Sequence, residues 1–249
     1  MPLVKTSAII LHSRKWGEAD RIVTCYTRHF GKIRAIARGA RRMKSRLGGS
    51  LEPFVLCRLD LFEKPGDSLY RVSQVSMQES FSKFRGDLTL MTVAARMVNF
   101  VAAVAAEGDA DSRLFEGLEQ GLRDLLTSSD PRLTVLLFQI RMLGMTGFKP
   151  QIDHCASCGR DRPETILHFS PTAGGLVCIV CASHQPAESV ALSQGSVAFL
   201  RQALHSTPGL LSRLNAVGQV RSEVEAAIEG YVTVVTGRRL PSVNCLLAT

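Results

Sequence analysis

Four of the seven cysteines form two pairs with the spacing of a metal site. Cys155 and Cys158 enclose two residues, Cys178 and Cys181 enclose two more, and 19 residues separate the pairs. A turn of this length, helped here by Gly159, places two thiolates along one edge of a tetrahedron. Four thiolates saturate Zn²⁺ and leave no open position for a reactive water. The spacing therefore predicts one structural zinc ion, with all four cysteines as its ligands.

Two other interpretations of these cysteines stay open. A redox-active dithiol needs one C-x-x-C in a βαβ context, which the sequence lacks, and structural disulfides are disfavoured in an intracellular protein. His154 and His184 flank the pairs and are expected to be exposed or hydrogen-bonded to a thiolate. Cys25, Cys57 and Cys245 lie singly among apolar neighbours, so we expect them to be buried structural residues.

Common sequence signatures of an enzyme are missing. The chain has no phosphate-binding loop, dinucleotide fingerprint, nucleophile elbow or zinc-protease motif. It also lacks the H-x-E and P-C-x-x-C motifs of a zinc deaminase. A zinc hydrolase or a dithiol oxidoreductase stays the competing hypothesis, and it requires an open metal position or a reactive thiolate. We expect a protein that is not an enzyme and predict no catalytic residue.

The positive charge is concentrated near the start of the chain. Residues 1–50 hold twelve Lys and Arg but two acidic residues, giving +10, whereas the whole chain carries +8. The remaining 199 residues therefore sum to −2. Between Lys32 and Arg46 there are seven cations in fifteen residues and no acid. Such asymmetry predicts a polyanion partner, and the alternative is a solvated basic face without a partner.

Cations on a strand and a neighbouring loop can follow a phosphate backbone, with binding that weakens steeply in salt. Trp16 adjoins Arg14 and Lys15. It suits either the core or a base-stacking role. Tyr26 and Phe30 are expected in the core. The segment resembles no base-reading helix, so the predicted binding is independent of nucleic-acid sequence.

Residues 1–80 have the pattern of a small five-stranded barrel of the OB type, although an SH3-like barrel fits nearly as well. Its short apolar and β-branched runs cover 6–13, 21–28, 32–38, 55–62 and 69–77. In the third run Ile33, Ala35 and Ala37 are expected to face inward and the cations outward, with Ile36 an apolar exception on the outer face.

From residue 81 the apolar spacing becomes helical. Helices are predicted over 88–106, 114–126, 133–143, 193–204 and 222–235. Asp130 or Ser129 can cap the third helix, with Pro131 in its first turn. A hairpin around Pro171–Gly175 is expected to return the second cysteine pair to the first. The predicted domains are 1–80 (barrel), 81–249 (helical bundle) and an inserted zinc module at 151–185, an α+β multidomain fold.

A membrane-spanning protein is excluded by hydropathy, because the longest apolar-rich stretch has about ten residues whereas a spanning helix needs roughly 20. The run Ala8–Leu11 is also too short for a signal peptide. We expect a cytoplasmic, nucleoid-associated protein.

The sequence resembles a known family in several blocks. Residues 8–54 (AIILHSRKWGEADRIVTCYTRHFGKIRAIARGARRMKSRLGGSLEPF) are similar to the N-terminal domain of the RecO recombination mediators of bacterial DNA repair. The blocks GMTGFKPQIDHCASCGR and FSPTAGGLVCIVCA are similar to the zinc-bearing members. The tail GRRLPS has Pro241 where the family more often has Lys.

This resemblance implies an OB fold, a helical domain and a zinc module without enzymatic activity. It also implies binding to single- and double-stranded DNA, annealing of complementary strands, and partnership with RecR and single-strand-binding protein, so that the recombinase loads on covered DNA. The alternative function is a zinc-ribbon basic scaffold for RNA or acidic proteins. The residues expected to contact DNA are Arg14, Lys15, Arg21, Lys32, Arg34, Arg38, Arg41, Arg42, Lys44 and Arg46.

Overall fold

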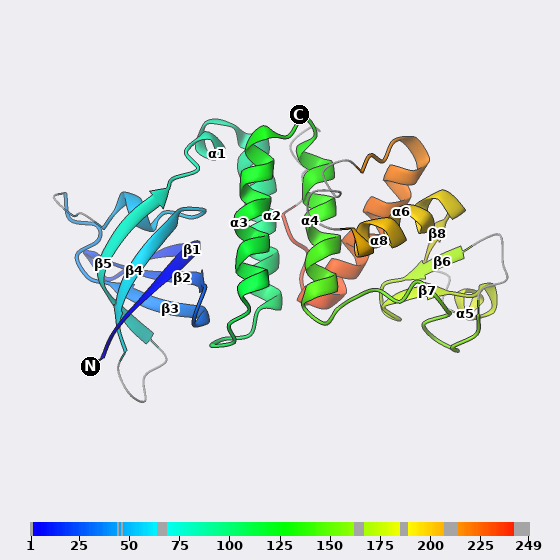
Figure 1. Ribbon diagram of the computed structural model, residues 1–249, viewed down its shortest axis with the longest axis horizontal. Coiled ribbons are helices and arrows are strands. Elements are labelled where there is room, and N and C mark those ends of the chain that lie inside the picture. The colour runs from blue at the N-terminus through cyan, green and yellow to red at the C-terminus, as the bar shows by residue number, and fades with distance from the viewer. Residues whose placement is uncertain are drawn as a thin grey trace. The chain divides into compact units, whose positions relative to one another are not determined.

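The computed structural model describes residues 2–43, 45, 47–63, 69–161, 167–184, 189–206 and 214–241 (Figure 1). Its described residues form two compact units, one up to Thr127 and one from Ser128 to Pro241. Lys44, Arg46 and Cys245, to which the sequence assigned roles, lie outside the described residues. The predicted domain boundaries at 80/81 and at 151–185 stay predictions.

Five strands of the first unit close into a barrel, as the sequence predicts. The strands are β1 (Leu3–Trp16), β2 (Asp20–Thr27), β3 (Gly31–Ala37), β4 (Leu56–Phe62) and β5 (Leu69–Glu79). Their order around the barrel is β1-β2-β3-β5-β4, and β3 and β5 pair in parallel while the other pairs are antiparallel. This arrangement is that of an OB-type barrel.

The barrel core is made by alternate residues of each strand. Ile33, Ala35 and Ala37 are buried as predicted, and Ile36 is half-buried on the outer face. Cys25 and Cys57 are fully buried in the same core, and burial raises the pKa of the Cys57 thiol to about 12. Both are therefore structural residues, as expected for isolated cysteines among apolar neighbours.

A bulge in β1 decides which way the end of that strand points. Ile10 pairs with Cys25, but His12 pairs with Thr24, so one extra residue lies on the β1 side. An extra residue reverses the alternation that follows it. Because of this shift, Arg14 and Trp16 lie on the outer face of the barrel.

Three helices complete the described part of the first unit: α1 (Lys83–Gly86), α2 (Leu88–Val104) and α3 (Ser112–Thr127). A short 3-10 helix, η1 (Gly49–Leu51), precedes β4. The Asp87 carboxylate caps α2 by accepting from the Leu90 N–H at 3.0 Å. The three- and four-residue spacing of the leucines in α3 buries Leu114, Leu118 and Leu122, as predicted.

The described part of the second unit combines three longer helices with a small sheet. The helices are α4 (Pro131–Met145), α6 (Gln194–His205) and α8 (Gly218–Thr236), and α5 (Ile179–Ser183) is short. The sheet has the order β7-β6-β8, from β6 (Leu167–Ser170), β7 (Gly175–Val177) and β8 (Val190–Leu192). The β6–β7 hairpin confirms the predicted turn around Pro171–Gly175.

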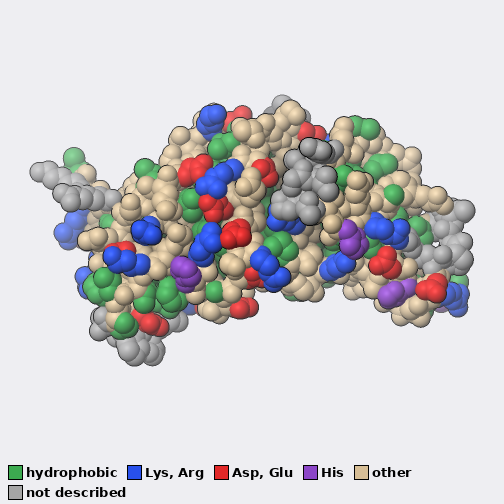
Figure 2. Space-filling view, in the orientation of Figure 1, with side chains coloured by type: hydrophobic (Ala, Val, Ile, Leu, Met, Phe, Trp, Pro, Cys, Tyr) green, Lys and Arg blue, Asp and Glu red, His purple; other side chains and the backbone are tan. Residues whose placement is uncertain are grey.

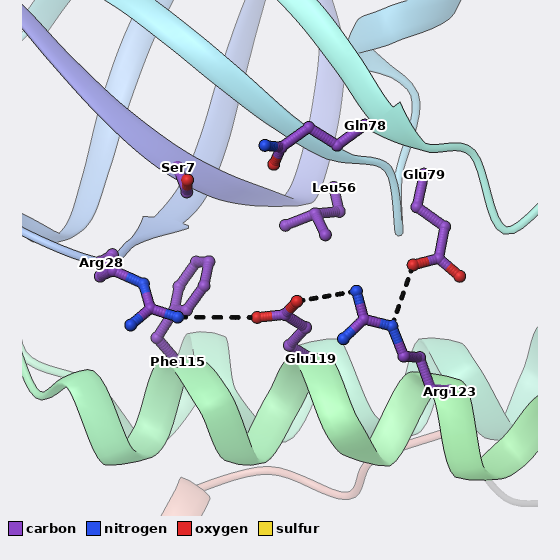
Figure 3. Close-up of a pocket in the computed structure, with 8 residues that line it drawn as sticks. All are labelled: Ser7, Arg28, Leu56, Gln78, Glu79, Phe115, Glu119 and Arg123. Carbon is purple, nitrogen blue, oxygen red and sulfur yellow. Dashed lines mark hydrogen bonds and ion pairs between the residues drawn. The ribbon is translucent and has the colours of Figure 1, made fainter.

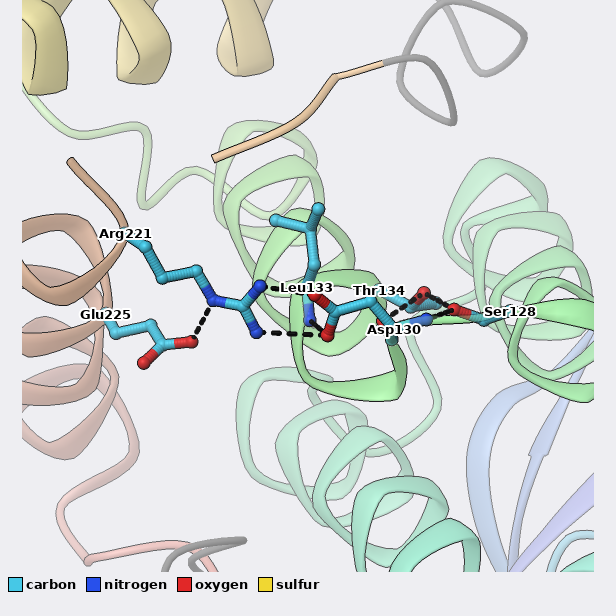
Figure 4. Close-up of polar contacts among 6 residues, drawn as sticks. All are labelled: Ser128, Asp130, Leu133, Thr134, Arg221 and Glu225. Carbon is cyan, nitrogen blue, oxygen red and sulfur yellow. Dashed lines mark hydrogen bonds and ion pairs between the residues drawn. The ribbon is translucent and has the colours of Figure 1, made fainter. Parts of the chain in front are cut away.

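One side chain joins two helices of this unit (Figure 4). The Asp130 carboxylate accepts from the Leu133 N–H at 3.0 Å and so caps α4, with Pro131 in the first turn, as predicted. The same carboxylate binds both terminal nitrogens of Arg221, whose Nε donates to Glu225 Oε1 at 2.6 Å. This pairing lowers the pKa of Asp130. A single aspartate thus starts α4 and fixes α8 to it.

The membrane-spanning potential of the described helices follows from their length and hydropathy. None of them has the length and apolar character needed to cross a bilayer.

Candidate nucleic-acid interface and metal centre

The outward cations of β3 differ in what they contact. At the start of the strand, Lys32 Nζ donates to the Ala102 carbonyl at 2.8 Å, and burial beside α2 lowers the pKa of Lys32. Two residues further, Arg34 Nε lies 3.6 Å from Glu107 Oε1. The start of β3 is therefore used in packing the barrel against α2 and the residues that follow it.

The other end of β3 opens into a hollow of about 500 Å³. We call it the Trp16 hollow; it is lined by Trp16, Asp20, Ile36, Arg38, Gly39 and Arg42. Trp16 is 57% exposed, which favours the stacking interpretation of this residue over the core. Ile36, the apolar exception of the sequence pattern, is one wall of this hollow.

Two turns form the rim of the Trp16 hollow, and they are bonded to each other. The Gly39 N–H donates to Asp20 Oδ1 at 2.7 Å, in a turn where Gly39 has φ +66°, which side chains rarely tolerate. Arg41 Nη1 donates to the carbonyls of Gly17 and Glu18 at 3.1 and 3.0 Å. The turn after β3 is thereby fixed on the β1–β2 turn.

Strand register adds a residue that the sequence did not point out. Across the outer face, Arg14 pairs with Ile22, Ile22 with Ile36, and Ile36 with Arg71 of β5. Arg71 is exposed. The only signal for its position is the parallel β3–β5 register, which no local pattern reveals. We name this outward set the basic face: Arg14, Trp16, Arg34, Ile36, Arg38, Arg42 and Arg71.

The remaining predicted DNA contacts are placed differently. Arg21 donates to Ser13 Oγ at 2.9 Å and lies 2.9 Å from Glu52 Oε1, so its charge is compensated within the barrel. Lys15 is exposed opposite Arg21, on the other side of β1 from Trp16. Within the described residues no carboxylate forms an ion pair with Arg14, Lys15, Arg38 or Arg42. These four are the predicted cations whose charge is most available.

The two other aromatic residues of this region belong to the core, as expected. The Tyr26 hydroxyl donates to the Asp111 carbonyl at 3.3 Å and accepts from the Asp111 N–H at 3.1 Å. Burial raises the pKa of this tyrosine. Phe30 is half-buried, with its ring centre 6.4 Å from that of Tyr70.

A second cluster of cations, between the barrel and α3, is neutralised by acids (Figure 3). Glu119 lies 2.8 Å from Arg123 and 3.9 Å from Arg28, and Arg123 Nε donates to Glu79 at 3.1 Å. On the face drawn in Figure 2, Lys and Arg side chains alternate with Asp and Glu around α3. This alternation distinguishes the packing surface from the basic face, where carboxylates are scarce.

The four paired cysteines converge at one point of the second unit. Their sulfur atoms all lie within 4.8 Å of one another, and Cys158 Sγ is 3.9 Å from Cys178 Sγ. Four sulfurs at about 2.3 Å from a tetrahedral Zn²⁺ would be about 3.8 Å apart. The cluster therefore has the size and the soft donor set that suit a zinc ion.

Backbone N–H groups lower the pKa of one of these thiols, which favours the thiolate form that binds a metal. Burial raises the pKa of Cys155, but donation from the N–H groups of Cys158, Cys178 and Ser157 outweighs it, and the pKa falls to about 6. The Cys178 N–H lies 3.3 Å from Cys155 Sγ. His154 and His184 are both exposed, which was one of the two expected environments for these residues. Neither belongs to the cluster.

Comparison with known proteins shows which family the chain belongs to. Residues 1–81 match the family described as "Recombination protein O N terminal", and residues 85–243 match "Recombination protein O C terminal". The chain belongs to the RecO family of DNA repair proteins. It is 30% identical to a RecO from Desulforamulus reducens and 31% identical to one from Bacillus pumilus. Each match covers 96% of this chain and 92% of the relative.

A RecO from Desulfitobacterium hafniense is 33% identical over 86% of this chain and 78% of its own length. The relatives are named as DNA repair proteins. RecO membership agrees with the resemblance seen in residues 8–54 and around the cysteine pairs.

Proposed function

We propose that this RecO-family protein binds single- and double-stranded DNA through the basic face, without sequence specificity. The observation that carries the proposal is the set of cations at the open end of the face, Arg14, Arg38, Arg42 and Arg71, which no described carboxylate neutralises. Guanidinium groups bind phosphate oxygens bidentately, and release of counterions from DNA supplies most of the binding free energy. Strand-borne arginines contact phosphates and leave base edges unread, hence the expected lack of specificity.

The function that follows is that of a recombination mediator. Two complementary strands on one cationic surface repel each other less and reach a higher local concentration, so annealing needs no bond chemistry. On family grounds we further propose RecR and single-strand-binding protein as partners, with loading of recombinase as the indirect result. The four-cysteine cluster is proposed to hold one structural Zn²⁺, which supplies folding free energy rather than catalysis.

The test is a salt titration of binding to labelled oligonucleotides, followed by fluorescence anisotropy. Four phosphate contacts give a slope of log affinity against log salt of about −3 for a single strand. A dye–quencher annealing assay under the same conditions should show faster pairing with the protein than without it. A slope near zero overturns the proposal, and an RNA strand that binds far more tightly than the same DNA sequence favours the RNA scaffold instead.

A further inference from the structure

We propose that the Trp16 hollow holds one unpaired nucleobase of single-stranded DNA, stacked on the indole, while Arg38 and Arg42 bind the phosphates on either side of it. The proposal rests on the proposed DNA binding and adds a site for the base to the contacts with phosphate. It would give the basic face a means of telling a single strand from a duplex.

The composition of the hollow favours a nucleotide. Trp16 offers a flat apolar surface, Ile36 a second apolar wall, and Arg38 and Arg42 two cations, all lining one space. A nucleotide has the same two parts, a flat base without charge and an anionic phosphate next to it. Stacking of a base on an aromatic side chain tolerates any base, which agrees with binding that ignores sequence. An acidic peptide would satisfy the arginines but has no ring for the indole unless it is aromatic.

The exposure of Trp16 is unusual for its residue type and its surroundings. It is the single tryptophan of the chain, and the residue is 57% exposed at the end of β1. The β1 bulge at Ile10/His12 is what turns the side chain outward, onto the face that carries Arg14. Without that shift the strand would direct the indole toward the opposite side of the sheet.

The site is also preformed. The bond from the Gly39 N–H to Asp20 and the bonds from Arg41 to the carbonyls of Gly17 and Glu18 hold the two turns together. Fixed walls reduce the conformational entropy that the protein loses on binding a ligand. In a duplex the faces of each base are covered by its neighbours, so the hollow accepts an unpaired base only.

Because the chain has one tryptophan, its tryptophan emission, excited selectively over that of the tyrosines, reports on this site alone. We would titrate the full-length protein with a thymidine 20-mer and with an abasic 20-mer that carries the same phosphates. Stacking should quench the emission with the thymidine strand and leave it nearly unchanged with the abasic strand. The abasic strand is also expected to bind about tenfold more weakly, which is within the range for loss of one stacked base.

Variants at Trp16 and at a control position test whether the indole itself contributes to binding of a single strand. Trp16→Ala should lower affinity for the thymidine strand about tenfold, lower affinity for a duplex less than twofold, and keep the salt slope. Trp16→Phe should restore part of the lost affinity. Leu88→Ala is the matched control, because Leu88 is 59% exposed at the start of α2 in the same unit. Thermal unfolding checks that each variant is folded.

The outcomes distinguish the two proposals. DNA binding with a steep salt slope, but equal quenching by thymidine and abasic strands, overturns the stacking site and leaves the DNA function intact. An equal loss on single strand and duplex in Trp16→Ala does the same. If the wild-type protein binds neither DNA, both proposals fall, and quenching by an acidic aromatic peptide in that case identifies the other occupant.

Discussion

The Asp20 carboxylate accepts a 2.7 Å hydrogen bond from the backbone N–H of Gly39, and this bond joins the first residue of β2 to the turn after β3. Trp16 ends β1 just before Asp20, and Arg38 lies in the turn with Gly39, so the shape of the Trp16 hollow depends on this bond. A carboxylate at this position is also the one acid among the residues that line the hollow.

Replacement of Asp20 tests this bond. Asp20→Ala removes the acceptor from a half-buried backbone N–H, and we expect the free energy of unfolding of the first unit to fall by about 1 kcal/mol. Asp20→Asn keeps an oxygen acceptor and should lose less. Urea unfolding measures both, and equal losses in the two variants would show that the hydrogen bond contributes little.

The cations of β3 should separate into two classes by function. Arg38→Gln/Arg42→Gln removes two available charges, so the salt slope of single-strand binding is expected to become shallower by about 1 to 2 with little change in unfolding. Lys32→Gln removes the bond to the Ala102 carbonyl and should lower stability more than it changes the slope. Anisotropy and thermal unfolding on the same samples give both quantities.

The control for this comparison carries the same change of charge elsewhere. Arg58→Gln/Lys83→Gln alters two exposed cations of the first unit, on β4 and α1, away from the basic face. A control that flattens the salt slope as much as the Arg38/Arg42 variant would mean that binding follows net charge alone.

Loss of a ligand from the cysteine cluster should lower the stability of the second unit and leave DNA binding by the first unit unchanged. Cys158→Ser removes one of four ligands, so we expect less than one zinc per chain by metal analysis and an unfolding midpoint lower by roughly 10 °C. The slope of DNA binding should persist at temperatures where the protein is folded. His154→Ala is the control, since His154 is exposed next to the cluster and should leave the metal content at one per chain.

The carboxylate of Glu223 should make the stability of the second unit depend on pH in the acidic range. Burial raises the pKa of Glu223, but donation from the Ser193 N–H at 2.7 Å and Ser196 Oγ at 2.6 Å prevails and lowers the pKa to about 2. A carboxylate with a depressed pKa adds stability above its unfolded pKa of about 4.3, and this part is lost as the pH falls toward 2. We expect the stability of the wild type to decline across that range.

The matching variant is Glu223→Gln, which should be less stable at pH 7 and lose less stability between pH 5 and pH 3. Glu18→Gln, in the exposed β1–β2 turn, serves as the control and should follow the wild type. Denaturant unfolding at a series of pH values measures the difference, and parallel curves for the wild type and Glu223→Gln would refute the assignment.

Local sequence patterns were sufficient for most elements of this fold. Alternation placed Ile33, Ala35 and Ala37 in the barrel core, and helical spacing with an Asp-Pro start placed α4. The spacing of the C-x2-C pairs alone predicts the cysteine cluster. The short α5 and β8 were not predicted, because three to five residues give too little periodicity to recognise.

The sequence could not predict which cations between Lys32 and Arg46 pack inside the unit and which stay available. Lys32 and Arg38 are both outward cations of the same alternating run, and only the contact with α2 makes Lys32 a packing residue. Arg71 lies outside residues 32–46 and joins the basic face through the parallel pairing of β3 and β5. Both effects depend on contacts between residues far apart in the chain.

That parallel pairing has a consequence for the order of folding. β1, β2 and β3 are successive antiparallel neighbours and can assemble as soon as they leave the ribosome, whereas β5 must cross back to β3 after β4. Contacts of greater sequence separation form more slowly. A nascent chain would therefore display Trp16 and Arg38 early and acquire Arg71 only when the last strand closes the barrel.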